Sequence, residues 1–244
     1  ARREPQGEQR AHRDPEPAVD EVHPTFETEL HGAALFYTSA DFDGALDPAS
    51  IGHLRTILAG RFAIEAQLAS CSQVHGVHVV HAAASSEWCE YPGCDALFTD
   101  HAHTALGIKV ADCLPVTIID PVHSVMANIH SGWRGAVAAI VNRTVSALQR
   151  GTSFDPARSL AWLGPSIRSC CFEVGEEVVE SFSRDFEGIE QFVDRSRGER
   201  PRFDIPAFTR SRLVAAGLDA DSIHDSELCT RCDGSIFHSY RRNG

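Results

Sequence analysis

Branched apolar residues mark two strands near the middle of the chain. The runs Pro115 to Ile119 and Val125 to Ile129 are rich in valine and isoleucine, and the sequence Asp-Pro-Val-His-Ser separates them. Such a short polar connection between two apolar runs is typical of adjacent strands joined by a tight turn. We therefore expect these two runs to pair as a hairpin.

Helical spacing is clearest in the segment that follows. Between residues 136 and 150 the apolar side chains that share one helical face are Val137, Ile140, Val141, Val145 and Leu148. Gly151 comes next, and glycine often ends a helix. We expect one helix over residues 136–150.

Two more helices are indicated by their end signals. Residues 176–186 have a helical pattern after Gly175, and Asp204 is a candidate N-cap with Pro206 in the first turn and Gly217 after the last. Aspartate at the cap and proline in the first turn are common helix-start signals. Both segments are predicted to be helical.

Shorter patterns complete the outline. Residues 34–39, 77–81 and 160–163 are apolar runs of strand length, and residues 48–58 have a helical pattern. Strands and helices follow one another without internal repeats. This order predicts an α/β (α+β) sandwich in which helices flank a mixed β-sheet core.

The first 25 residues differ from the rest. They mix charges of both signs with four prolines and have almost no large apolar side chains. Such a segment gains too little from burial to offset the entropy of ordering. We expect a flexible tail over residues 1–25 and a single domain over 26–244.

Composition and charge limit the classes of molecule that this protein is expected to bind. The chain is 43% hydrophobic and 23% charged, and its formal net charge is −12. An acidic protein is not attracted to nucleic acid or anionic lipid, so small molecules are the expected partners. Without a candidate membrane span or secretory signal, we expect a cytoplasmic location.

Three short blocks place a ligand or nucleophile beside glycine or proline. They are QVHG at 73–76, ADCLP at 111–115 and HSGWRG at 130–135, and they contain His75, Cys113 and His130. Cys113 precedes the first strand of the expected hairpin and His130 follows the second, so the two side chains should be neighbours.

A neighbouring cysteine and histidine have two chemical uses. Thiolate and imidazole are good zinc ligands, and three protein ligands with one open position are typical of a catalytic zinc site. Alternatively, the imidazole activates Cys113 as a nucleophile. His75 favours the metal. A third interpretation is that Cys113 is a packed apolar residue and the histidines only form hydrogen bonds.

These blocks resemble those of a known family, the YfiH-like laccase-domain proteins, also known as the peptidoglycan editing factor type. The similarity also includes DALFTD at 95–100, LGPSIRSCCFEVG at 163–175, and CT with SYRR at 229–242. Members were first described as multicopper polyphenol oxidases and later assigned purine nucleoside phosphorylase activity. Six blocks in the same order are much more specific than any one of them.

The resemblance implies a site, a reaction and a fold. His75, Cys113 and His130 would bind Zn²⁺, with Cu²⁺ as an alternative, and would be the catalytic centre. Adenosine or inosine would be split by phosphate into base and ribose 1-phosphate, with adenosine deamination as a related activity. The implied fold is an α/β sandwich similar to bacterial deamidating toxins, and homodimers are usual.

The residues are compatible with phosphate binding. Arg134 and the amides around Gly132 and Gly135 lie where the expected helix over 136–150 begins, and helix N-termini attract anions. Arg241, in the SYRR block, is a further candidate for substrate contact. An alternative role for Arg134 is a structural salt bridge.

Two features depart from the family pattern. Members usually have a Ser-Thr-Arg segment before a glycine-rich loop, whereas residues 38–44 read TSADFDG and have no arginine. Its loss predicts weak or altered activity. Relatives also continue into a last strand beyond the position of Gly244.

Other functions and sites remain open. One is a metal-free Cys113–His130 hydrolase or amidase acting on peptidoglycan precursors, and another is a metal-binding protein without catalysis. A polyphenol oxidase is disfavoured, because one methionine and the α/β pattern do not suit a blue-copper centre, despite His101 and His103.

The remaining cysteines suggest a structural zinc site only weakly. Cys229 and Cys232 form one CxxC, which Cys89 and Cys94 would have to complete. A single CxxC is a poor predictor, so we interpret Cys232 as incidental. The adjacent pair Cys170–Cys171 is interpreted as core or loop packing.

Overall fold

The computed structural model describes residues 26–30, 33–37, 67–83 and 88–243, together with residues 52, 54–56 and 59–60. Its strands are β1 (Phe26–Leu30), β2 (Ala33–Tyr37), β3 (Gln67–Ser72), β4 (Val79–His81), β5 (Cys89–Pro92), β6 (Ala96–Thr99), β7 (Thr104–Gly107), β8 (Leu114–Asp120), β9 (Val125–Ser131), β10 (Leu160–Leu163), β11 (Val193–Asp194), β12 (Arg202–Phe203) and β13 (Ile223–Asp225). Its helices are α2 (Trp133–Val137), α3 (Ile140–Gly151), α4 (Glu176–Asp185), α5 (Ile205–Ala215) and α6 (Tyr240–Asn243), with short 3-10 helices at Pro156–Arg158, Ile189–Phe192 and Ala220–Ser222.

A six-stranded mixed sheet forms the centre of the described structure. Its strand order is β13-β10-β8-β9-β6-β4. The two outer pairs, β13 with β10 and β4 with β6, are parallel, and the inner pairs are antiparallel. The predicted hairpin is confirmed, because β8 and β9 pair along seven residues from Leu114↔Ser131 to Asp120↔Val125.

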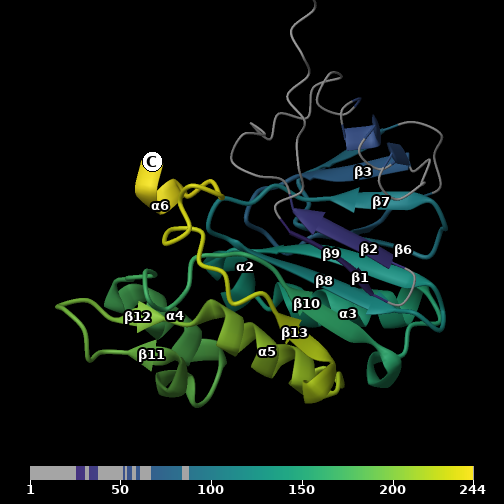
Figure 1. Cartoon of the computed structure of the whole chain (residues 1–244). Helices are drawn as coiled ribbons and strands as arrows, with labels where there is room; N and C mark the ends of the chain where they lie inside the picture. Colours follow the sequence, from purple (N-terminus) through teal and green to yellow (C-terminus); the bar gives the residue numbers. More distant parts are fainter. Residues whose placement is uncertain are drawn as a thin grey trace, which may run out of the picture.

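The layers follow from the two faces of this sheet. In Figure 1, helices α3 and α5 cover one face, and the three-stranded sheet β5-β3-β7 lies on the other side. Strand β6 shows how one strand serves both layers. Ala96 and Phe98 pack into the helix-side core, whereas Leu97 between them packs against the small sheet. This alternation is the period-two pattern of a strand. The predicted sandwich of a mixed sheet and helices is confirmed.

The predicted helix over residues 136–150 is wrong in one respect. Two helices occupy this region, α2 and α3, and Ala139 between them has a left-handed backbone with φ of 62°. The predicted apolar face exists only in α3, where Ile140, Val141, Val145 and Leu148 are buried. No glycine or proline marks the break, so the local sequence does not reveal it. The break therefore separates Trp133 and Arg134, which lie on α2, from the buried face of α3.

The β8–β9 turn is organised by a buried carboxylate. Asp120, whose side chain is fully buried, accepts hydrogen bonds from the backbone N–H groups of Val122, His123 and Asp155 and pairs with the His123 ring. Burial raises the pKa of Asp120, but these donors outweigh it and hold the pKa below its ordinary value. The charged carboxylate therefore stabilises the turn that sets the hairpin register.

Other predicted elements have mixed outcomes. Strand β10 and helices α4 and α5 are confirmed, and Asp204 caps α5 by accepting a hydrogen bond from the Ala207 N–H. The strand predicted over 77–81 is shorter, and that over 34–39 is described as β2 up to Tyr37. Residues 1–25 and 38–44 lie outside the described residues; of the helix predicted over 48–58, only 52 and 54–56 are described, and these are helical. None of the described helices is long and apolar enough to cross a bilayer.

Candidate metal centre

The structure brings His75, Cys113 and His130 together. Cys113 precedes β8 and His130 lies near the end of β9, and the pairing Pro115↔His130 places them side by side. His75 comes from the loop after β3. Cys113 Sγ lies 3.8 Å from His75 Nε2, the two imidazole rings meet edge to face at 4.8 Å, and one ligand atom from each residue lies within 4.8 Å of the others.

This geometry suits a zinc ion. With Zn–S and Zn–N distances of about 2.3 and 2.0–2.1 Å, a tetrahedral site separates sulfur from nitrogen by about 3.6 Å. The Cys113–His75 separation of 3.8 Å is close to that value. One thiolate and two imidazoles are also a typical donor set for a zinc ion with a free fourth position. The three residues therefore fit the metal that the resemblance implies.

A glycine makes room for the convergence. A Cβ at Gly132 would lie 3.0 Å from Cys113 Sγ and 3.1 Å from His75 Cδ2. Both separations are tighter than nine in ten real Cβ contacts. A Cβ at this position would require Cys113 Sγ and the His75 ring to shift by a few tenths of an ångström, so the glycine is favoured by close approach and not by its backbone angles.

Asp95 orients two of the three candidate ligands. It is fully buried; Oδ1 accepts hydrogen bonds from His75 N at 2.9 Å and from His130 Nδ1 at 2.8 Å. Oδ2 accepts from the N–H groups of Gly76 and Val74 at 2.7 and 3.3 Å. Because a carboxylate only accepts, Nδ1 of His130 carries a proton and the neutral ring keeps its Nε2 lone pair for a metal.

Asp95 was missed as a site residue by sequence reasoning. It opens the DALFTD block, but that block resembles an ordinary strand, and only the pairing of β6 with β9 brings it beneath His130. The usable signal was chemical, since metal-binding histidines commonly donate their second N–H to a carboxylate.

In the absence of a cation, the surroundings favour the neutral forms of Cys113 and His130 and the charged form of Asp95. Burial, with smaller effects from Asp112 and Asp95, raises the pKa of Cys113 to about 11. Burial also lowers the pKa of His130, although Asp95 partly opposes this change. Burial raises the pKa of Asp95, but the His130 ring and the Gly76 and Val74 amides outweigh it, so the net shift is downward. A thiolate at Cys113 therefore needs a positive charge beside it.

A cavity of about 610 Å³ opens directly beside the three ligands. Cationic residues in its lining are Lys109, Arg134 and Arg241, and aromatic ones are Trp133, Phe172 and Tyr240. The carboxylate in the lining, Asp112, is already occupied: it accepts from Thr230 Oγ1 at 2.6 Å and from the Arg241 N–H at 2.7 Å. A protein of net charge −12 thus presents a cationic cavity.

The predicted phosphate-binding residues are only partly grouped at this cavity. Gly132, Arg134 and Arg241 line it. Gly135 instead packs beneath, where a Cβ would come within 3.1 Å of the Gly76 carbonyl oxygen. The helix that begins here is the five-residue α2, not the predicted 136–150 helix. Arg134 stacks on Trp133 at 4.3 Å, and among the described residues it has no ion pair.

The other predicted histidines and cysteines lie elsewhere. His101 groups with His81 and Asp100 at an exposed position, and His103 is not part of that group. Cys94 lies 3.1 Å from Cys71 in the small-sheet core. It is therefore not grouped with Cys229 and Cys232, which the structure places beside Cys170 and Cys171 instead.

The fold and the site together define an α/β sandwich protein with a Cys-His ligand centre beside a cationic cavity. Comparison with known proteins identifies the family to which this chain belongs. The chain belongs to the multi-copper polyphenol oxidoreductase laccase family, whose model matches residues 35–244. The resemblance to YfiH-like laccase-domain proteins is thereby confirmed.

Several curated proteins are similar to this chain. Adenosine deaminase RL5, from an unknown prokaryotic organism, is 39% identical over 62% of this chain and 58% of its own length. Purine nucleoside phosphorylase YlmD of Geobacillus stearothermophilus is 31% identical over 71% of this chain and 66% of its own length. Each match thus spans less than two thirds of that relative. Purine nucleoside phosphorylase PA4543 of Pseudomonas aeruginosa is 35% identical over 81% and 77%.

Solved structures share the fold. Bacillus licheniformis hypothetical protein YfiH superposes with a TM-score of 0.76, at 24% identity and covering 86% of this chain and 87% of that one. The crystal structure of YlmD from Geobacillus stearothermophilus has a TM-score of 0.71 at 28% identity, covering 80% and 76%.

Proposed function

We propose that this protein is a zinc-dependent purine nucleoside phosphorylase that converts adenosine or inosine and phosphate into free base and ribose 1-phosphate. Adenosine deamination is a related activity at the same site. The proposal rests on one observation: His75, Cys113 and His130 line a cavity whose wall also contains cationic and aromatic side chains. Relatives named for both activities support it.

The cavity matches the size and chemistry of these substrates. Its volume of about 610 Å³ lies within the range of small-molecule sites, about 300–1,000 Å³. Trp133, Phe172 and Tyr240 offer flat apolar surfaces for a purine ring. Arg134, Arg241 and Lys109 offer positive charge for phosphate, and arginine in particular matches phosphate geometry.

Phosphorolysis needs charge stabilisation at two points. A phosphate oxygen bonds to the anomeric carbon of ribose while the bond to the purine nitrogen breaks and its electron pair stays on the base, which then takes up a proton. Arg134 and Arg241 would hold the phosphate close to the sugar. The loss of translational and rotational entropy then occurs on binding and does not add to the barrier of the reaction. A zinc ion bound by the three residues supplies a Lewis acid near the base and, for deamination, the means to activate water.

The chain's own residues prepare that centre. Asp95 fixes the His130 tautomer and ring position, and its bonds to the backbone of residues 74–76 hold His75 in place despite a positive φ of 59°. Asp112 anchors Arg241 through the backbone N–H, which keeps the C-terminal segment at the cavity. A preorganised site of this kind needs little rearrangement when substrate binds.

The test is product analysis with zinc-loaded protein. Adenosine and inosine are incubated with and without phosphate, and base, inosine and ribose 1-phosphate are separated by chromatography. Base release that requires phosphate supports the phosphorylase, and phosphate-independent inosine formation from adenosine supports the deaminase. Absence of both products in the metal-loaded protein refutes the proposal.

Variants locate the chemistry. His75→Ala, Cys113→Ala and His130→Ala should each lose turnover and the metal ion at this centre, and activity that survives all three changes refutes this site. Arg134→Ala should keep the metal but raise KM for phosphate. Arg150→Ala removes an exposed arginine at the end of α3 and is the matched control.

The metal-free hydrolase is the alternative that the same preparation distinguishes. It requires a reactive Cys113 thiolate, and the raised pKa of Cys113 disfavours one without a neighbouring cation. Protein that contains no metal at the His75 centre and loses a hydrolase activity to iodoacetamide equally with and without chelator would establish the hydrolase instead. A diphenol oxidation assay with copper-loaded protein tests the oxidase. The homodimer and the cytoplasmic location stay predictions.

A further inference from the structure

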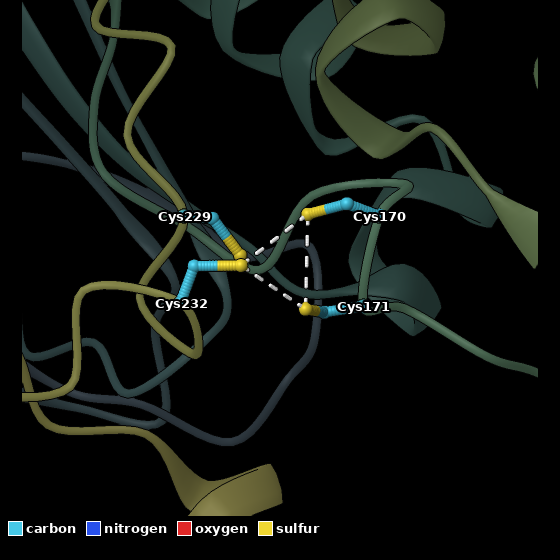
Figure 2. Close-up of side chains that lie close together, drawn as sticks. All are labelled: Cys170, Cys171, Cys229 and Cys232. Carbon is cyan, nitrogen blue, oxygen red and sulfur yellow. Dashed lines mark hydrogen bonds between the residues drawn. The ribbon is translucent and has the colours of Figure 1, made fainter.

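Four cysteines meet at a second place in the molecule. Cys170 and Cys171 lie on the turn between β10 and α4, whereas Cys229 and Cys232 lie in the segment after β13. Figure 2 shows the four side chains from these two loops with their sulfur atoms facing one another. All four sulfur atoms lie within 4.8 Å of one another, and all four cysteines are free thiols.

The sulfur separations match those of a metal site. Four sulfur atoms at about 2.3 Å from one tetrahedral zinc ion lie about 3.8 Å apart. In this cluster Cys170 and Cys232 are separated by 3.7 Å, Cys170 and Cys171 by 3.7 Å, and Cys171 and Cys232 by 3.4 Å. Side-chain packing alone does not explain why four sulfur atoms lie at these separations.

Backbone contacts hold both loops in this arrangement. Ser166 bridges to Cys229, with Ser166 N donating to the Leu228 carbonyl and Thr230 N donating to the Ser166 carbonyl. The Cys229 carbonyl accepts from Asp233 N at 2.9 Å, which closes the turn that contains Cys232. Cys171 N donates to the Arg168 carbonyl at 2.8 Å, which closes the other turn. Main-chain hydrogen bonds thus hold the two turns that contain the four cysteines.

The four thiols form a cluster that is partly open to solvent. Cys229 is buried, Cys171 half-buried, and Cys170 and Cys232 exposed. Burial raises the pKa of Cys229, but backbone N–H groups of Arg168, Cys232 and Arg231 outweigh it and lower the pKa. Side-chain hydrogen bonds with Cys171 and Cys229 raise the pKa of Cys232, and a hydrogen bond with Cys170 partly opposes this change.

We propose that Cys170, Cys171, Cys229 and Cys232 bind a second metal ion, a structural zinc or a similar thiophilic divalent cation with four sulfur ligands. Binding releases the thiol protons to solvent, since the thiolate is the ligand. The site is separate from the His75 centre and does not depend on the proposed reaction.

The ion would fasten the C-terminal segment to the body of the protein. That segment continues from Cys232 to α6, whose Tyr240 and Arg241 line the cavity. A four-thiolate clip would therefore act as a structural support for one wall of the cavity. A closed set of four protein ligands is typical of structural zinc.

Metal analysis of the purified full-length chain tests the proposal. We expect about two zinc ions per chain after loading and removal of excess metal. The double variant Cys170→Ser/Cys232→Ser should lose one ion and keep the other, and His75→Ala/His130→Ala should do the same for the other site. Cys89→Ser, a half-buried cysteine outside both groups, is the matched control and should keep both.

Cobalt absorption and alkylation give readings that do not depend on activity, and the alkylation needs no variant. Cobalt bound to the His75→Ala/His130→Ala variant should show intense sulfur-to-cobalt charge-transfer absorption, because all its remaining ligands are thiolates. In the unsubstituted chain, zinc should protect the four cysteines from iodoacetamide, as mapped by mass spectrometry, and a chelator should remove that protection. A single zinc per chain with these four cysteines alkylated at equal rates with and without zinc overturns the proposal, as does a disulfide among them in protein purified under reducing conditions.

Discussion

Replacement of Asp95 by asparagine tests how the candidate metal centre is held. The substitution keeps the shape of the side chain but removes its charge and leaves one accepting oxygen instead of two. Four donors point at the native carboxylate: the backbone N–H groups of Val74, His75 and Gly76, and the His130 ring. The asparagine NH₂ group replaces one of the two oxygens and is itself a donor. Two of the four N–H groups therefore have no acceptor.

The magnitude follows from the bonds that are lost. Hydrogen bonds to a charged group contribute about 1.5–3 kcal/mol each, and two of the four are lost. Relief of the buried charge offsets part of this, so we expect a loss of about 2–4 kcal/mol in the free energy of unfolding. If the NH₂ group faces His130, Nδ1 must accept and the proton moves to Nε2, where a metal would bind. Zinc affinity should fall about 10- to 100-fold.

Two measurements separate these effects. Urea unfolding of the metal-free chain gives the stability change, and competition with a chromophoric chelator gives the zinc affinity. Asp100→Asn is the matched control: it removes the same charge in the same block, but from an exposed carboxylate paired with His81 at 2.9 Å. That change should cost at most about 1 kcal/mol and leave zinc affinity unaltered. If Asp95→Asn behaves like Asp100→Asn in both assays, the orienting role assigned to Asp95 is wrong.

Three further substitutions test local features. Gly132→Ala should weaken zinc binding, as measured by chelator competition, because its Cβ would come within 3.0 Å of Cys113 Sγ; unchanged affinity would contradict the close approach. Ala139→Gly should raise stability by about 0.5–1 kcal/mol in urea unfolding because it relieves the left-handed backbone at φ of 62°, whereas Ala138→Gly, with φ of −80°, should lower it. Asp120→Asn should cost about 2–3 kcal/mol at pH 7. Since the folded-state pKa of Asp120 is depressed, its contribution is present above about pH 4 and is lost as the pH falls through the folded-state pKa, so the wild-type and variant unfolding free energies should converge in acid.

Local pattern was sufficient where one strand or helix has a regular buried face. Strand β8 has consecutive branched residues from Val116 to Ile119, and the start of α5 has its cap and proline in the expected positions. The hairpin register alone placed Cys113 beside His130. The third ligand, His75, lies 38 positions before Cys113, and only the family blocks connected the two.

Long-range contacts explain what was missed. The break at Ala139 occurs in a run of alanine and valine without any helix-breaking residue, so it must be imposed by how α2 and α3 pack. Cys170 and Cys232 are 62 positions apart on two loops, and no periodic pattern relates loop residues to each other. Asp95 became visible only once β6 paired with β9. Each of these features depends on contacts between segments and not on the spacing within one.

Hydrogen bonds to Asp112 connect the candidate metal centre with the four-cysteine group. Asp112, the neighbour of Cys113, accepts from Thr230 Oγ1 and from Arg241 N, and Thr230 follows Cys229 of the second group. Asp112 itself has a positive φ of 83°, a strained angle that these partners help to maintain. A change in the order of residues 229–232 is therefore transmitted to Asp112 and, through the adjoining peptide, to the candidate ligand Cys113. Loss of the second metal should accordingly loosen the C-terminal wall of the cavity and weaken phosphate binding there, while zinc at the His75 centre is retained because Asp95 still holds both histidines.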